Sequence, residues 1–359
     1  MNDSALVAAR APVDLRARWL LAILIASICA LYTWYQHSYF MAQRVAPDSL
    51  FLWRAANLLL AGGDPWSADV WAHGAASASA TADVAWQVTL HDPLYYPMPA
   101  VVLWLPLALL PFLVASTLFN TVGAFLFVMA VTRDGLLRAW VCGSVPFMIA
   151  MRFGQWSPMI SAAWVYPMLA GVLVAKPNLG LPVFLARPGW RAAALCSAML
   201  VLPTVAAPWW VSGWLHNVSS EMGRVTPHPA PVTLFSGAGV LLLLVVLRWR
   251  RPEARLFLVL ACLPQLPYWA DQLPLMLVPH TRREVLGMLL VTLVGFSCWM
   301  AFAPAKGDFV DTIRPVAVLC TYLPALVVIL RRSNTGQTTA WLEKWLVSRL
   351  PTFLRGTSA

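Results

Sequence analysis

Apolar runs separated by short polar connectors repeat along most of the 359 residues of the chain. The first run, 19–36, contains no charged residue and approaches the ~20 residues that a helix needs to cross a bilayer. From residue 97 onward the runs are dense and often broken by proline, and several have only about 9 to 14 residues. Such pieces indicate broken or re-entrant helices, which line a cavity or pack against protein. The pattern predicts an all-α polytopic membrane protein with about 10 to 12 spanning helices, built as one domain over residues 1–359.

The longest stretch without a spanning run, 37–96, is predicted to be the first extracytoplasmic loop. Its acidic residues outnumber its basic ones, which fits the outer side of a membrane. Within it, the apolar positions of 49–61 recur at helical spacing, although this segment is too polar to cross a bilayer. The spacing predicts an amphipathic helix that lies at the membrane interface and follows Asp48 directly.

Two further segments are predicted to lie at the membrane surface. The stretch 209–231 forms a second outer loop, and its Trp209, Trp210 and Trp214 are typical of an interfacial aromatic anchor. The tail 332–359 contains "TTAWLEKWLVSRL", in which apolar residues recur at helical spacing beside basic ones. This pattern predicts a helix on the inner face of the membrane.

Composition agrees with a membrane location. Hydrophobic residues make up 60% of the chain and charged residues 11%, against about 25% charged in soluble proteins. The net charge of +10 comes from arginines clustered in short connectors, which is the positive-inside pattern and argues against a nucleic-acid partner. We therefore expect membrane lipids as partners and a multi-pass protein of a bacterial inner membrane with both termini cytoplasmic. The six cysteines lie within apolar runs without metal-ligand spacing, so no metal site is predicted.

Ionisable residues at membrane depth are the first candidates for chemistry, because they are costly to place there. Asp48 follows the first span by about twelve residues, near the outer interface. One interpretation makes its carboxylate the N-cap of the helix that starts at Ser49. The other makes it a general base held over a membrane cavity, and the two roles are compatible.

Lys176 and Asp271 also carry two interpretations each. Lys176 lies in an apolar stretch before Pro177, where its ammonium either snorkels to the interface or binds a phosphate. Asp271 lies between two apolar runs, either as a second carboxylate in the same cavity or as a turn acid.

Several other polar residues are candidates for substrate binding. Arg152 and Gln155 flank a glycine turn, and Tyr96 precedes a proline at the start of the second span. Three histidines of the outer loops are candidates for phosphate contacts: His91, His216 and His228. No nucleotide-binding or protease motif is present, so an enzyme of this kind needs a substrate that is already activated.

Taken in order, three stretches resemble glycosyltransferase family 87, the polyprenyl-phosphate-mannose-dependent α-mannosyltransferases of the GT-C superfamily. They are "PDSLFLWRAANLLLAGGDPW", "LYYPMPAVVLWLPLALLP" and "RFGQWSPMI" followed by "LAGVLVAKPNLGLPVFLARPGWRAA". The likeness covers about 45–195, and the C-terminal half agrees only in hydropathy. The chain departs from the family in a compressed interval between its "GQ" and "KP" pairs and in Met98 within "YYPMP".

The resemblance implies a GT-C-like bundle whose first outer loop carries the catalytic acid, here Asp48. It implies transfer of a hexose such as mannose, with inversion, from a polyprenyl-phosphate carrier to a lipid or glycan hydroxyl, without a further cofactor. Asp48 would deprotonate the acceptor, and Lys176, with Arg152 or Arg54, would offset charge on the leaving phosphate. This expectation needs a groove between Asp48 and Lys176 that is wide enough for a lipid-linked sugar.

Two other classes of protein fit parts of the pattern. A secondary transporter of a small or lipid-linked solute would also have broken helices and buried ionisable residues. The roughly 60-residue first outer loop and the lack of matching halves argue against it. A non-catalytic membrane scaffold, in which Asp48 is only a cap, is the third possibility.

Overall fold

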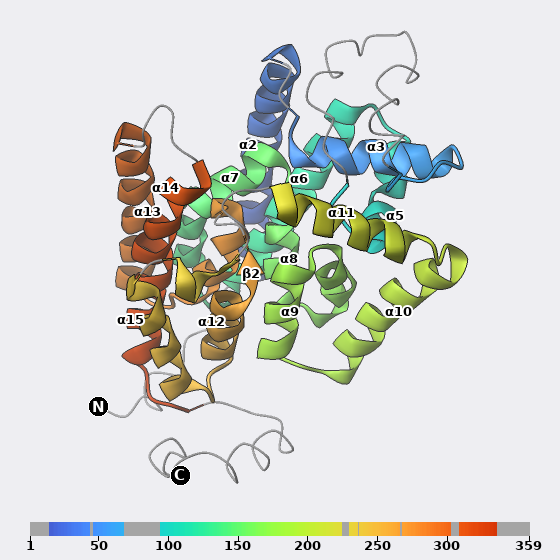
Figure 1. The fold of residues 1–359 in the computed structure, drawn as a ribbon. Helices are drawn as coiled ribbons and strands as arrows, with labels where there is room; N and C mark the ends of the chain where they lie inside the picture. Colours follow the sequence, from blue (N-terminus) through green and yellow to red (C-terminus); the bar gives the residue numbers. More distant parts are fainter. Residues whose placement is uncertain are drawn as a thin grey trace.

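The computed structural model describes residues 14–43, 46–67, 94–224, 230–235, 237–265, 268–302 and 309–335. These residues are mostly helical (Figure 1). The α-helices are α2 (Leu15–Gln43), α3 (Asp48–Leu60), α5 (Met98–Ala108), α6 (Phe112–Val131), α7 (Val145–Phe153), α8 (Ser157–Ala163), α9 (Pro177–Ala186), α10 (Trp190–Ala206), α11 (Trp210–Arg224), α12 (Pro252–Cys262), α13 (Arg282–Phe302), α14 (Phe309–Ala317) and α15 (Leu323–Leu330).

Shorter-pitch and irregular helices connect many of these elements. The 3₁₀ helices are η2 (Thr132–Asp134), η3 (Leu136–Gly143), η4 (Pro167–Ala175), η5 (Val232–Leu234), η6 (Gly237–Arg248) and η7 (Trp269–Leu277), and η8 (Val318–Tyr322) is a π-helical turn. Two short strands, β1 (Ala230–Pro231) and β2 (Pro264–Gln265), pair antiparallel with Ala230 opposite Gln265.

Several helices have the length and apolar character of membrane spans. Within the described residues there are four, and six if each of two bent pairs forms one span. The four are Leu15–Gln43, Phe112–Asp134, Arg282–Phe302 and Thr312–Leu330. The chain is thus an all-helical protein of the multi-pass membrane type. The predicted 10 to 12 full spans were too many by this measure, because several apolar runs fold as helices shorter than a span needs.

The first span is longer than the sequence predicted. Helix α2 continues to Gln43, so 37–43 belongs to this helix and not to the first outer loop. The helix can continue past residue 36 because the polar His37 ring is satisfied inside the protein. Its Nε2 donates to the Arg152 carbonyl (3.0 Å), and its Nδ1 lies 2.9 Å from Ser116 Oγ.

Two helices lie across the upper end of the molecule in Figure 1, at a steep angle to α2 and α13. One is α3, which agrees with the predicted amphipathic helix to within one residue at each end and buries Leu50, Leu52 and Ala55. The other is α11, which occupies most of the segment 209–231 that the sequence predicted as a loop. The predicted tail helix lies outside the described residues.

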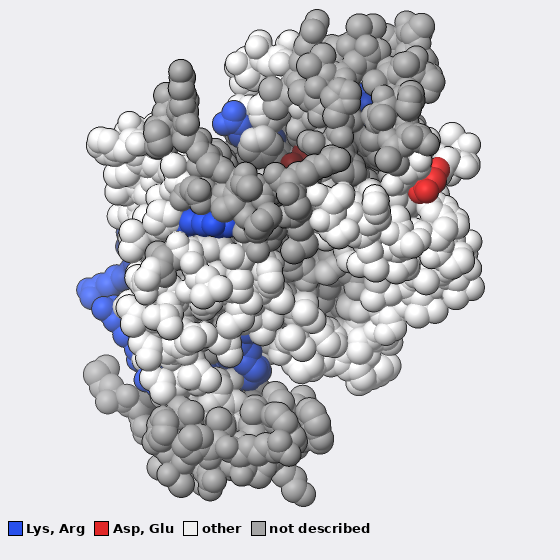
Figure 2. Space-filling model, viewed as in Figure 1, with Lys and Arg blue, Asp and Glu red and all other residues white. Residues whose placement is uncertain are grey.

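The interior between the spans is packed with apolar and aromatic side chains. Trp104, Phe119 and Trp156 form a continuous stack, with ring centroids 4.7 and 4.9 Å apart. Outside, most of the face in Figure 2 carries neither acidic nor basic side chains. An uncharged surface of this extent is what a lipid-facing protein requires.

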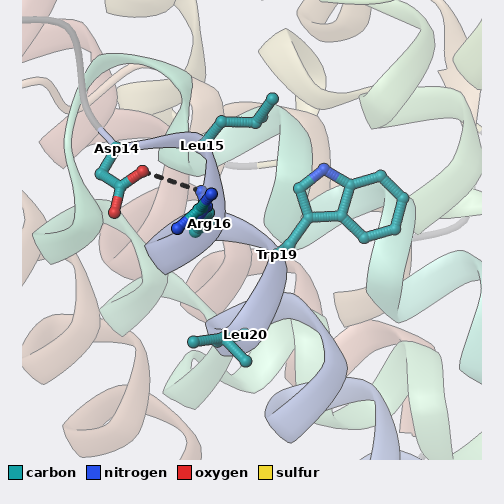
Figure 3. A pocket seen from close by; sticks show the side chains of 5 residues that line it. All are labelled: Asp14, Leu15, Arg16, Trp19 and Leu20. Atoms are coloured by element: carbon teal, nitrogen blue, oxygen red, sulfur yellow. Dashed lines mark hydrogen bonds between the residues drawn. The ribbon is translucent and has the colours of Figure 1, made fainter.

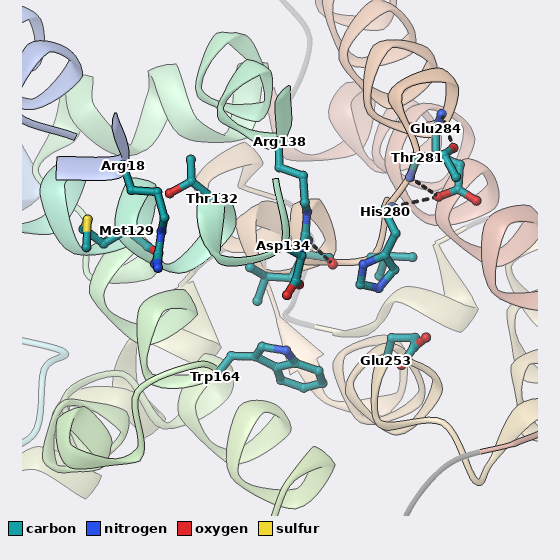
Figure 4. A network of polar contacts seen from close by, with 12 residues as sticks. Arg18, Met129, Thr132, Asp134, Arg138, Trp164, Glu253, His280, Thr281 and Glu284 are labelled. Carbon is teal, nitrogen blue, oxygen red and sulfur yellow. Dashed lines mark hydrogen bonds and ion pairs between the residues drawn. The ribbon is translucent and has the colours of Figure 1, made fainter. Parts of the chain in front are cut away.

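Arginines tie helix ends together at the end of the molecule opposite α3 and α11 (Figure 4). Arg332 bonds Glu253 (3.0 Å) and Glu284 (2.9 Å) and donates to the carbonyl of Val278 (2.8 Å). Arg138 donates to the neighbouring carbonyl of Leu277 (2.8 Å). These carbonyls end η7 and lack helical partners, so the guanidinium groups satisfy them.

Replacing the central arginine of this network should destabilise the protein. Arg332→Gln leaves Glu253 and Glu284 without their buried counter-charge and should lower the free energy of unfolding by about 3–5 kcal/mol. Arg331→Gln, at the exposed neighbouring position, should change it by less than about 0.5 kcal/mol. Thermal unfolding of the two purified variants in detergent tests this, and equal stability would contradict it.

Candidate active site

Asp48 stands at the first position of α3. The preceding Pro47 is extended (φ −71°, ψ 155°) and occupies the N-cap position, so Asp48 is not the cap that one interpretation required. Its half-buried carboxylate instead meets two side chains: Oδ2 accepts from Gln155 Nε2 (2.5 Å) and from Tyr96 Oη (3.1 Å). Oδ1 has no hydrogen-bond partner among the described residues. One carboxylate oxygen is fixed, and the other remains available to accept a proton.

Gln155 reaches Asp48 because a glycine ends the preceding helix. Gly154 closes α7 in the left-handed conformation (φ 68°), which residues with a side chain rarely adopt. A Cβ on Gly154 would also meet the side chain of Ser49, the residue after Asp48. Glycine therefore lets the α7–α8 turn approach the start of α3 and turns the Gln155 amide inward.

Lys176 is placed by the proline that follows it. A residue before proline avoids the helical conformation, and Lys176 is accordingly extended (φ −139°, ψ 85°) between η4 and α9. Its Nζ donates to Gln155 Oε1 (2.9 Å) and to Asp271 Oδ1 (2.5 Å). Asp271 also accepts from Asn178 Nδ2 (3.3 Å) through its other oxygen.

Six side chains thus form one connected chain of hydrogen bonds, which we call the Asp48 network: Tyr96, Asp48, Gln155, Lys176, Asp271 and Asn178. The Gln155 amide is the bridge, with N–H toward the carboxylate of Asp48 and oxygen toward the ammonium of Lys176. The reverse orientation would place like partners face to face. With Lys176 14% and Asp271 4% exposed, the network holds a buried ion pair.

The surroundings of Asp48 favour a base. Burial raises the pKa of its carboxyl above the ordinary value of 3.8, while the Lys176 charge and the hydrogen bonds from Gln155 and Tyr96 act to lower it. Burial and the nearby carboxylates raise the pKa of Tyr96 well above 10.0, so its hydroxyl stays protonated and donates. A carboxylate with a raised pKa accepts protons more readily near neutral pH.

The expected open groove between Asp48 and Lys176 is absent from the structure, because the Gln155 side chain fills this space and bonds both groups. Two surface hollows that the described residues form lie elsewhere. One, at the first turns of α2, is lined by Asp14, Leu15, Arg16, Trp19 and Leu20 (Figure 3). The other lies between α2 and α6.

The remaining sequence candidates lie around the Asp48 network or outside the described residues. Arg152 stands beside it, with its guanidinium over the rings of Phe40 (5.3 Å) and Phe153 (5.7 Å). Arg54 shares α3 with Asp48 but makes none of the network's hydrogen bonds. His216 is exposed on α11, and His91 and His228 lie outside the described residues. The roles of all these residues stay predictions.

Sequence reasoning missed the side chains that hold the end of α7 in place. The last carbonyls of this helix lack helical partners, and Asn120 Nδ2 donates to that of Met151 (2.6 Å) while His37 serves that of Arg152. Asn120 also donates to Thr33 Oγ1 (3.0 Å). The available signal was the presence of single polar residues within apolar runs, which does not say what they contact.

Comparisons of the chain with protein-family models, with curated proteins and with solved structures found no match. Among the described residues, no three His, Cys, Asp or Glu side chains are arranged to hold a metal ion. The geometry of the Asp48 network therefore carries the functional argument.

The ion pair within the Asp48 network allows a direct test of its arrangement. Lys176→Met leaves the carboxylate of Asp271 buried without its counter-charge and should lower the free energy of unfolding by about 3–5 kcal/mol. The double variant Lys176→Met/Asp271→Leu removes both charges and should recover most of this loss. Thermal unfolding in detergent provides the measurement. A single variant as stable as the unmodified protein would show that the two groups are not paired.

Proposed function

We propose that the chain is an inverting glycosyltransferase that moves a hexose, such as mannose, from a polyprenyl-phosphate carrier to a lipid or glycan hydroxyl at the outer membrane face. The observation that carries this proposal is a carboxylate with one free oxygen, placed at the start of an amphipathic helix and fixed by its other oxygen. The motifs around it are those that resemble glycosyltransferase family 87, and a GT-C-like bundle belongs to the same proposal.

Asp48 acts as the general base in this scheme. Its free Oδ1 takes the proton of the acceptor hydroxyl as the acceptor oxygen attacks C1 of the sugar. The bond between C1 and the phosphate oxygen breaks on the opposite face, and its electron pair leaves with the polyprenyl phosphate. A lipid-phosphate sugar is already activated, so neither a nucleotide nor a redox cofactor is needed.

Gln155, Lys176 and Asp271 hold the base in this scheme. Lys176 is already neutralised by Asp271 and bonded to Gln155, so its charge reaches Asp48 through the amide bridge. This arrangement favours the ionised carboxylate without placing a cation against it, which would lower its basicity too far. Direct contact between Lys176 and a phosphate would require the ion pair to open.

Arg152 is the better candidate for the phosphate of the donor. Its guanidinium makes no hydrogen bond or ion pair within the described residues, and its Nε is buried without a partner. Other half-buried arginines, such as Arg138 and Arg332, are bonded to carbonyls and carboxylates. An unpaired cation beside membrane-facing helices is costly, and an anionic headgroup would complete it.

The proposed orientation follows the charge distribution. The arginine network would face the cytoplasm, in agreement with the positive-inside rule, and α3 and α11 would lie on the extracytoplasmic side. Both termini would then be cytoplasmic, and a bacterial inner membrane that contains polyprenyl-phosphate sugars is the expected location.

A secondary transporter is the second candidate. The buried pair of Lys176 and Asp271, next to helices broken at Gly154 and Pro177, is the observation that favours it. Buried ionisable pairs of this kind can serve proton or ion coupling. Transport into vesicles that depends on Lys176, without any sugar transfer, would support this alternative.

The base assignment predicts a specific loss. Asp48→Asn should leave the protein folded but reduce sugar transfer by at least about 100-fold, because general-base catalysis contributes about 10²–10⁴. Asp64→Asn is the matched control: the Asp64 carboxylate only accepts from the Trp66 N–H in a turn that asparagine also forms. Transfer assays with purified protein test both, and full turnover by Asp48→Asn would remove Asp48 from the mechanism.

The same assignment fixes the sign of the pH dependence. Transfer should fall as the pH drops through the pKa of Asp48, which lies above 3.8. Tyr96→Phe removes a hydrogen bond to the carboxylate, so this acid limb should move to higher pH.

The phosphate assignment predicts a change in donor binding. Arg152→Met should weaken binding of polyprenyl phosphate by about 10- to 100-fold, the effect of losing a charge-assisted hydrogen bond. Arg191→Met removes an exposed arginine that stacks on Trp190 and should leave binding unchanged. Direct binding measurements in detergent decide, and equal affinities of the two variants would return the phosphate to Lys176 or Arg54.

A further inference from the structure

Three successive main-chain carbonyls before Pro97 each accept a side-chain N–H from another part of the chain. The Leu94 carbonyl accepts from Asn217 Nδ2 (3.3 Å) and the Tyr95 carbonyl from Trp214 Nε1 (2.8 Å). The Tyr96 carbonyl accepts from Trp66 Nε1 (3.1 Å). We call these donors the α11 clasp, since Trp214 and Asn217 belong to that helix and Trp66 is bonded to it.

The donors of the α11 clasp are themselves held tightly. Trp214 and Asn217 are three residues apart and thus lie on one face of the helix. Asn217 is 2% exposed and also donates to the Trp66 carbonyl (3.2 Å). Gly213 packs so closely on Trp66 that a Cβ there would come within 2.8 Å of the Trp66 Cβ.

The segment needs such donors because it cannot use a regular helix. Tyr96 precedes Pro97, which disfavours the helical conformation, and α5 begins only at Met98. A buried carbonyl without a partner costs free energy, so the side-chain N–H groups of the α11 clasp compensate for the missing backbone partners. The position of Tyr96 therefore depends on α11, a helix more than a hundred residues further along the chain.

The last link leads to the Asp48 network, because the Tyr96 hydroxyl donates to the carboxylate of Asp48. We propose that Trp214 and Asn217 are positioning residues, which hold the Tyr96 hydroxyl against Asp48 from α11. The significance of this role rests on the proposed function of Asp48 as a base, whereas the positioning itself can be measured without any substrate.

The experiment follows the titration of the Asp48 carboxyl in purified protein by difference infrared spectroscopy, with Asp48→Asn to assign the signal. The titratable groups that act on Asp48 are Lys176, Asp271 and Tyr96, and none is altered in the clasp variants. Asn217→Leu should shift the Asp48 titration to higher pH in the same way as Tyr96→Phe, because both remove the Tyr96 hydrogen bond. The double variant should shift no further than Tyr96→Phe alone.

Controls separate positioning from general damage. Ser219→Ala, at an exposed position of the same helix, should leave the titration unchanged. If Asn217→Leu does not fold, Trp214→Phe keeps an aromatic ring, loses the hydrogen bond to Tyr95 and should give the same direction of shift.

The outcomes are distinct. An unchanged titration in folded Asn217→Leu or Trp214→Phe, beside a shift in Tyr96→Phe, would overturn the proposal and leave α11 a packing element. No shift in Tyr96→Phe would also overturn it. A shift in all three, combined with normal sugar transfer by Asp48→Asn, would uphold the positioning and reject the proposed function.

Discussion

The pairing of Lys176 with Asp271 is the constraint on which the centre of this protein depends. An ammonium and a carboxylate that are both almost out of contact with solvent are costly unless they meet each other and satisfy their remaining hydrogen bonds. Here the remaining bonds are made by Gln155 and Asn178. Through the amide of Gln155, the same pair fixes one oxygen of Asp48, so an ionic contact inside the protein sets the geometry of a carboxylate at its edge.

Helix breakers bring these side chains together. Asp48 follows a proline, Tyr96 and Lys176 each precede one, and Gln155 follows a glycine with positive φ. At each of these points the chain leaves regular helix, and a polar side chain can turn toward a common centre. The interrupted apolar runs of the sequence are thus the means by which an otherwise apolar bundle places a polar network near one membrane face.

The sequence was sufficient for the features that depend on local pattern. It predicted the helical membrane class, the interfacial helix α3 and the residues Asp48, Gln155, Lys176 and Asp271 as candidates, because a charge in an apolar run is conspicuous by itself. It could not predict which of them touch. The closure of the space beside Asp48 by Gln155, the end of α2 at Gln43 and the contacts of Asn217 all depend on long-range packing, which leaves no local pattern. The number of spans was overestimated because apolar length alone does not reveal where a helix breaks.

The stereochemistry of the reaction tests the central claim most directly. Purified protein would be incubated with a panel of polyprenyl-phosphate sugars and a lipid acceptor, and the anomeric configuration of the product determined by nuclear magnetic resonance. A single base on one face of the sugar and a departing phosphate on the other predict a product with inverted configuration. Retention of configuration, or no transfer from any lipid-phosphate sugar, would contradict the account.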